Sequence, residues 1–271
     1  MNLLEIKEVT HDKYIFREGK HRFELKKAKI SYSKKPGDRV KGFIYSDRNG
    51  RLKFILGKPK ALLGNFAFLT VLDIQNSGVF LDWGIKPDLY VPKSEIMHMP
   101  KIGDQIPVFI KMDKKFKQII GTNLIEEYLV NADANIEPGN SCELLFYFKG
   151  RDRFGVIIDQ RYRGIIPISD VIGDFSPGDK AKGFIKNIDE DKRITVSLYK
   201  NKRHMIQSAE REIIKRLLDS GGTLPFHDKT FPKVINQELH MSKRLFKNAI
   251  GTLFKSKVIK IHDNGIELIK H

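Results

Sequence analysis

Pro36-Gly37-Asp38-Arg39-Val40-Lys41-Gly42-Phe43-Ile44 is a stretch that occurs three times in this chain of 271 residues. It returns as Ile102-Gly103-Asp104-Gln105-Ile106-Pro107-Val108-Phe109-Ile110, and again as Pro177-Gly178-Asp179-Lys180-Ala181-Lys182-Gly183-Phe184-Ile185. The Gly-Asp pairs begin at residues 37, 103 and 178, so the period is 66 and then 75 residues. Solenoid repeats have periods of roughly 20–50 residues. The longer period therefore predicts three small domains in tandem.

The repeated stretch has a structural explanation. Proline presets φ, glycine supplies an unusual backbone angle, and an aspartate side chain can bond a nearby backbone amide. A polar turn, a basic residue and an apolar strand follow each copy, at 49–52, 115–119 and 191–194. We interpret the stretch as the loop that leads into a fourth strand, and we assign its aspartates no catalytic role.

The third repeat shows most clearly which fold these units adopt. Turn residues separate five apolar runs, at 142–148, 154–159, 165–168, 182–188 and 193–199. A connector with little strand character, 169–176, follows the third run. This pattern is typical of a small antiparallel barrel, and a break between the third and fourth of five strands matches an OB-type Greek-key barrel.

The other two repeats follow the same course. In the second repeat the expected strands are 66–74, 78–82, 89–92, 106–112 and 118–122. In the more divergent first repeat they are 3–9, 13–16, 22–30, 40–45 and 52–56. We therefore expect three tandem five-stranded OB-fold barrels, at 1–62, 63–134 and 135–201.

From about residue 202 the apolar period changes from two to 3.6. Met205, Ala209, Ile213 and Leu217 mark one face of a helix that stops at the glycine pair 221–222. A short helix at 231–239 and a third helix after an N-cap at Ser242 follow. The expected buried stripe of the third helix is Leu245, Phe246, Ala249, Ile250, Leu253 and Phe254. Apolar runs at 258–261 and 266–269 flank an Asn-Gly turn, which is a strong hairpin signal. We expect an α/β winged-helix domain at 202–271, and the whole chain is predicted to be a mainly β, multidomain protein.

The net charge of +16 is unevenly distributed. Residues 1–62 carry +10 and residues 200–271 carry +8, whereas 63–135 carry −2 and 136–199 are neutral. Basic ends favour a polyanionic partner. The single cysteine, Cys142, is expected to be buried, and no cofactor or metal motif is present. Without a signal segment or a long apolar run, we expect a cytoplasmic protein with no membrane contact. We also expect a monomer.

Two segments resemble the second and third strands of S1 RNA-binding domains. They are 78–82 with 88–95, and 154–159 with 164–170. Three such units followed by a winged helix resemble the conserved virulence factor B family of bacterial RNA-binding regulators. The resemblance implies control of gene expression after transcription, including that of virulence factors.

The resemblance also implies where bases stack. S1 domains place aromatic rings on the second strand and a histidine on the third. Phe154 matches the first aromatic position and Phe80 matches the second, whereas Ser77 and Ile157 stand at the corresponding positions of the other repeat. Prolines, at 92 and 167, occupy the histidine position. Because no repeat keeps the full set, we expect binding to be shared among the domains.

Single-stranded RNA needs aromatic faces for its bases and cations for its phosphates. In the three later domains the candidate nucleic-acid-binding residues are Phe80, Trp83, Lys149, Arg151, Arg153, Phe154, Arg161, Tyr162, Arg163, Lys243, Arg244, Lys247 and Lys255. In the first repeat, weaker candidates are Tyr14 and Phe16 with Arg17 and Lys20. The basic face of the third helix also fits duplex nucleic acid.

Two alternatives to an RNA-binding regulator stay open. One is a DNA-binding transcription regulator that uses the winged helix, and the other is a scaffold associated with the ribosome or a polymerase. No Gly-rich phosphate loop with a lysine, no GxSxG elbow and no HExxH motif is present. We therefore expect no enzymatic activity.

Overall fold

The computed structural model describes residues 2–30, 32–46, 51–116 and 118–269. The predicted turn at 49–50 and Lys117 lie outside these residues. The chain forms two compact units, Met1–Tyr128 and Leu129–His271. Residues 129–134, which we assigned to the second repeat, belong to the second unit, where Val130 forms a bridge with Tyr162.

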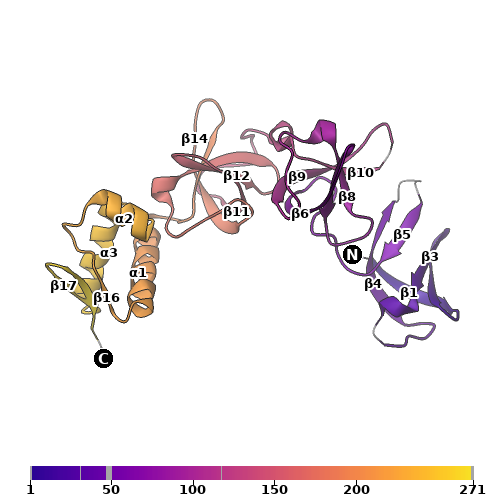
Figure 1. The fold of residues 1–271 in the computed structure, drawn as a ribbon, viewed down its shortest axis with the longest axis horizontal. Coiled ribbons are helices and arrows are strands. Elements are labelled where there is room, and N and C mark those ends of the chain that lie inside the picture. Colours follow the sequence, from indigo (N-terminus) through magenta and orange to yellow (C-terminus); the bar gives the residue numbers. More distant parts are fainter. Residues whose placement is uncertain (1, 31, 47–50, 117, 270–271) are drawn as a thin grey trace. The chain divides into compact units, whose positions relative to one another are not determined.

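The first unit begins with a five-stranded antiparallel sheet in the order β3-β2-β1-β4-β5 (Figure 1). Its strands are β1 (Asn2–Val9), β2 (Lys13–Glu18), β3 (His21–Lys26), β4 (Arg39–Ser46) and β5 (Leu52–Ile55). The expected strand 22–30 ends at Lys26, because Lys27–Lys29 form a 3-10 turn that Ile30 N–H closes on the Lys27 carbonyl. Tyr14 and Phe16 are buried in the core of this sheet, so neither ring is open to a base.

The second sheet of this unit repeats the same order of strands, β10-β9-β6-β7-β8. The strands are β6 (Phe66–Gln75), β7 (Gly78–Asp82), β8 (Leu89–Pro92), β9 (Gln105–Met112) and β10 (Ile119–Thr122). A 3-10 turn, Lys93–Glu95, follows the third strand, and another, Ile125–Tyr128, follows the fifth. The second unit opens with a closed barrel of β11 (Ser141–Lys149), β12 (Arg153–Ile158), β13 (Tyr162–Pro167), β14 (Lys180–Ile188) and β15 (Ile194–Ser197). Here β13 and β15 pair in parallel, which closes the OB-type barrel.

The repeated Gly-Asp stretch has the same role in all three sheets. In the second sheet Gly103 N–H donates to the Val71 carbonyl, and Val71 N–H donates to the Asp104 carbonyl. The Asp104 side chain accepts from Lys101 N–H at 2.8 Å, as the Asx interpretation predicted. Equivalent bonds join Gly37-Asp38 to Ile6 and Gly178-Asp179 to Phe146. In each first strand a β-bulge follows this contact, so the stretch fixes the point where the strand bends.

Three helices and a small sheet complete the second unit. They are α1 (Lys202–Asp219), β16 (Thr223–Leu224), α2 (Pro232–Leu239), α3 (Lys243–Lys255), β17 (Ile259–His262) and β18 (Gly265–Leu268). The Ser242 hydroxyl caps α3 by accepting from Leu245 N–H, as predicted. The predicted stripe of α3 is buried except for Phe254, which is 53% exposed at the last turn of the helix, so its assignment to the core was wrong. Ile172, from the third barrel, is buried in the core of the helical domain.

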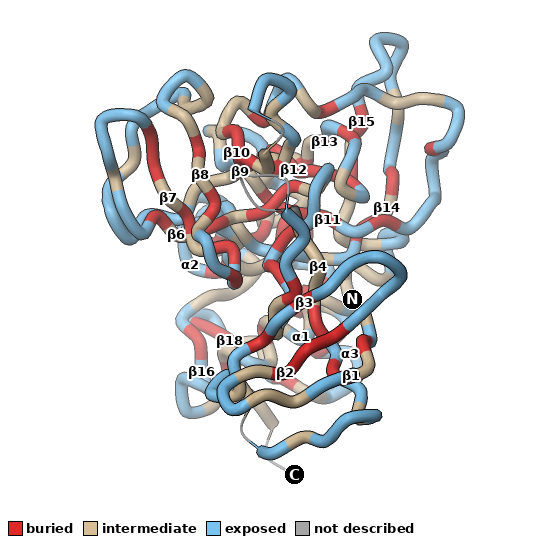
Figure 2. Tube along the Cα trace, turned by 90° about the vertical axis from the view of Figure 1, so that its right-hand side faces the viewer, coloured by how far each residue is buried: buried red, intermediate tan, exposed pale blue. Residues whose placement is uncertain are grey.

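The protein is mainly β, with OB-type five-stranded sheets followed by a C-terminal domain of three helices and a small sheet, as the sequence predicted. Figure 2 shows the buried positions within strands and helices, and the exposed positions mainly in the loops between them. Among the described residues, no helix is long and apolar enough to cross a membrane.

Candidate nucleic-acid interface

The outer face of β7 and β8 carries a pair of aromatic rings. Phe80 lies opposite Tyr90 in the strand register, and their ring centroids are 5.2 Å apart. Both residues are half-buried, because Val79, Leu81 and Val91 on either side of them point into the core. The Tyr90 hydroxyl donates to the Ser77 carbonyl at 2.7 Å, which fixes the position of that ring. Tyr90 was not among the predicted binding residues, although its alternation with Leu89 and Val91 could have identified it as an outward-facing ring.

A third aromatic ring of this domain lies in the hairpin between β9 and β10. Phe116 is 60% exposed, and the Lys115 ammonium is 5.2 Å from its ring centroid. The Asp113 carboxylate accepts from the backbone N–H groups of residues 115 and 116, each at 2.8 Å, so the loop is held by its own hydrogen bonds. Loops in this position of an OB fold bind oligonucleotides. The sequence predicted only a turn for this segment. The feature that could have identified it as a binding loop is an aromatic residue among lysines.

Trp83 does not lie on this surface. The side chain is 5% exposed in the core of the second sheet, and its Nε1–H donates to the Pro87 carbonyl at 2.9 Å. A buried indole with a satisfied N–H has no free face for a base, so the structure does not place this candidate where it could stack.

The two aromatic candidates of the third barrel are also buried. Phe154 is 3% exposed and packs edge-on against Phe146, with centroids 5.3 Å apart. It points inward because it shares the parity of Val156 and Ile158, both of which are in the barrel core. Tyr162 is 6% exposed, and its hydroxyl donates to Asp133 at 2.8 Å. Neither ring is available for stacking.

The outer face of the third barrel lacks the aromatic pair found on β7 and β8. Ile157, which corresponds to Phe80, is only 1% exposed. Ile165, which corresponds to Tyr90, is half-buried. In the described residues, a half-buried aromatic pair on the outer face of the second and third strands is therefore a feature of the second sheet.

The predicted cations of the third barrel are exposed, and most of them form ion pairs at the surface. Arg153 holds Asp152 with two bonds of 3.0 Å, which raise the pKa of the guanidinium. Arg161 bonds Asp133 at 2.7 Å and lies 5.0 Å from the Tyr162 ring centroid. Lys149 pairs with Asp174 at 3.3 Å. The remaining two candidates, Arg151 and Arg163, are also exposed. Exposed pairs of this kind are worth little, so phosphate can compete for these cations.

The polar face of α3 is a cationic surface. Arg244, Lys247 and Lys255 are exposed and Lys243 is half-buried, while the opposite face packs in the core. Within the described ranges none of the four has an ion-pair partner. The positive charge of this face is therefore not compensated by neighbouring carboxylates.

Comparison with known proteins agrees with this architecture. An S1 domain model matches residues 1–54 and 63–123, and a CvfB-like winged helix domain model matches residues 211–268. Conserved virulence factor B of Staphylococcus epidermidis is 23% identical over 241 residues, covering 86% of this chain and 81% of that protein. The chain therefore resembles conserved virulence factor B proteins over most of its length.

Other relatives extend the similarity over the full length. Uncharacterized protein YitL of Bacillus subtilis is 24% identical over 270 residues, covering 97% of this chain and 90% of that protein. A crystal structure of a multidomain protein with nucleic acid binding domains from Streptococcus pneumoniae is 24% identical, with a TM-score of 0.42 and coverage of 99% and 97%. S1 and winged-helix domains are nucleic-acid-binding rather than enzymatic families, and they support nucleic-acid binding by this chain.

Proposed function

We propose that this protein binds single-stranded RNA in the cytoplasm and regulates gene expression after transcription, including that of virulence factors. The observation that carries the proposal is the half-buried Phe80–Tyr90 pair on the outer face of the second and third strands of an S1-matched sheet. Each base stacked on such a ring contributes ~1–3 kcal/mol, with little dependence on its identity. Conserved virulence factor B is the name of several relatives, which supports the regulatory part of the proposal.

Affinity is shared between two kinds of surface. The second sheet supplies rings, at Phe80, Tyr90 and Phe116, whereas the third barrel and α3 supply mainly cations. Cations attract any phosphate backbone, and this contribution weakens as salt rises. Stacking persists at high salt and requires bases that are free of a duplex. The combination favours a single strand over a duplex.

The test is fluorescence anisotropy with single-stranded RNA, single-stranded DNA and duplex DNA of equal length, each across a salt series. We expect the full chain to prefer the single strands and to retain measurable RNA affinity at high salt. A chain that fails to bind single-stranded RNA even at low salt would contradict the proposal. Crosslinking and sequencing of bound transcripts in cells would then identify the regulated RNAs.

The unpaired cations of α3 favour a second candidate function, binding of duplex DNA by the winged helix. This alternative predicts that the chain prefers the duplex in the same titrations. It also predicts that the preference is lost when Lys243, Arg244 and Lys247 are changed together to alanine.

A further inference from the structure

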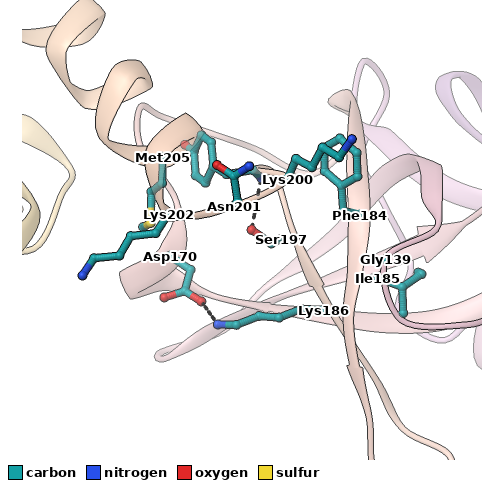
Figure 3. A pocket seen from close by; sticks show the side chains of 11 residues that line it. Gly139, Asp170, Phe184, Ile185, Lys186, Ser197, Lys200, Asn201, Lys202 and Met205 are labelled. Carbon is teal, nitrogen blue, oxygen red and sulfur yellow. Dashed lines mark hydrogen bonds and ion pairs between the residues drawn. The ribbon is translucent and has the colours of Figure 1, made fainter.

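A pocket of about 480 Å³ lies in the second unit, where the third barrel leads into α1 (Figure 3). Its walls come from β14, from the segment after β15 and from the first turn of α1. They are lined by Gly139, Asp170, Phe184, Ile185, Lys186, Ser197, Tyr199, Lys200, Asn201, Lys202 and Met205. Pockets for small ligands typically have volumes of ~300–1,000 Å³. None of these residues is among the candidates that the sequence suggested for RNA binding.

The charge of the pocket favours an anion. Three lysines line it, at 186, 200 and 202, against one carboxylate, Asp170. Lys186 already bonds Asp170 at 2.7 Å, and Figure 3 shows this pair at one side of the open space. Lys200 and Lys202 are exposed and have no ion-pair partner in the described part of the chain. Figure 3 shows their ammonium groups at opposite sides of the view, with Lys200 on the side of Phe184. Lys200 is therefore the unpaired lysine that remains for a negative group bound on that side.

The remaining wall suits a flat apolar group. The Phe184 ring is half-buried, and no other aromatic ring packs against it among the described residues. Met205 and Ile185 add apolar surface, and the Ser197 hydroxyl adds a polar atom. Phe184 belongs to the third copy of the repeated stretch, yet its ring is not part of the barrel core. A half-buried ring beside an unpaired lysine matches a ligand that joins an aromatic base to a phosphate.

Another pocket of the second unit, of about 460 Å³, has the opposite balance of charge. It lies beside α1 and α2 and is lined by three carboxylates, Glu212, Asp219 and Glu238, and by two cations, Lys215 and Arg216. Its excess of negative charge would repel a phosphate.

We propose that the pocket between β14 and α1 binds one nucleotide, with the base against Phe184 and the phosphate at Lys200. The nucleotide comes either from a free mononucleotide or from one position of a bound RNA strand. If the nucleotide is one position of an RNA strand, the pocket proposal rests on the proposed RNA binding. If it is a free mononucleotide, the pocket proposal is independent of RNA binding.

The experiment titrates the full chain with uridine and guanosine monophosphates, and separately with oligouridine RNA, by calorimetry. Phe184→Leu keeps an apolar side chain but removes the flat ring, and Lys200→Ala removes one unpaired cation. We expect each variant to bind the ligand about fivefold or more weakly, as removal of one stacking ring or one phosphate-binding charge implies. Lys180→Ala is the matched control, because Lys180 is an exposed lysine of β14 outside the pocket.

The outcomes of the experiment distinguish a free nucleotide from one position of an RNA strand. They also distinguish failure of the pocket proposal from failure of the proposed function. Mononucleotide binding that Phe184→Leu weakens supports a site for free nucleotides. RNA binding that both pocket variants weaken, without mononucleotide binding, supports a site for one position of the strand. If the wild-type chain binds RNA and the pocket variants match Lys180→Ala with every ligand, the pocket proposal is overturned while the proposed function stands. If RNA does not bind, and mononucleotides either bind equally to all variants or bind to none, both the pocket proposal and the proposed function are overturned.

Discussion

At Gly103 the backbone has a φ of 91°, in the left-handed region that side chains rarely adopt. The residue donates to the Val71 carbonyl, so its conformation cannot relax without breaking that bond. We expect Gly103→Ala to lower the free energy of unfolding of the second sheet by ~1–3 kcal/mol. Trp83, the single tryptophan, is buried in that sheet, so urea titration followed by its fluorescence measures the effect where it occurs.

A matched glycine provides the control. Gly251 is in α3, where an added Cβ would meet nothing within 4 Å. Gly251→Ala should stabilise the helix by ~0.5–1 kcal/mol and leave the Trp83 transition unchanged. An unchanged Trp83 midpoint in Gly103→Ala would show that the turn tolerates a side chain and would contradict the assigned role.

The chemistry of Cys142 is the second prediction at this scale. The side chain is 6% exposed, and burial raises the pKa of its thiol to about 12. The thiolate is the reactive form, so little of it exists in the folded protein near neutral pH. Alkylation by iodoacetamide at mildly alkaline pH should be slow in buffer and fast in urea. Modification of the folded chain at the rate of free glutathione would contradict this account.

Residue types could be predicted from the sequence more reliably than their orientations. Phe80 and Phe154 are both aromatic residues of second strands, but one points outward and the other into the core. The alternation of Phe154 with Val156 and Ile158 carried that information, whereas the resemblance to S1 strands did not. Trp83 lies beyond the end of its strand, where alternation predicts no direction and only packing decides.

At the scale of elements, the basic face of α3 has a distinct expected signature. Changing Lys243, Arg244 and Lys247 together to alanine should reduce the slope of log affinity against log salt by about 0.7 for each phosphate of a single strand that the helix no longer neutralises. The buried stripe is untouched, so the helix should remain folded. The measurement is RNA anisotropy from low to high salt, checked by circular dichroism. A slope equal to that of the wild type would exclude α3 from the interface.

Most strands could be located from the sequence to within a residue or two, because glycine and polar turns separate them. The 3-10 turns after each third strand, Lys27–Lys29, Lys93–Glu95 and Ile168–Asp170, were not predicted. A single hydrogen bond closes each of them, which leaves no periodic pattern to detect. The two-residue strand β16 exists through its pairing with β18, a contact distant in sequence.

At the scale of the whole molecule, the excess of positive charge and the Phe80–Tyr90 pair lie in different domains. The first 62 residues and the last 72 hold the excess of positive charge, whereas the ring pair lies in the second sheet, in a segment of slightly negative charge. We expect this division to separate the salt-dependent and salt-resistant parts of RNA affinity. The distribution of charge could be predicted from the sequence; the face on which the rings meet required the fold.

The measurement that tests the central claim most directly compares the full-length wild type with the Phe80→Ala/Tyr90→Ala variant by anisotropy with single-stranded RNA across a salt series. The account predicts affinity at least about fivefold lower at every salt concentration, with an unchanged salt slope, because stacking and not charge is removed. Trp83 fluorescence verifies that the sheet remains folded. A folded variant that binds RNA as tightly as the wild type would contradict the claim that this ring pair carries the interaction.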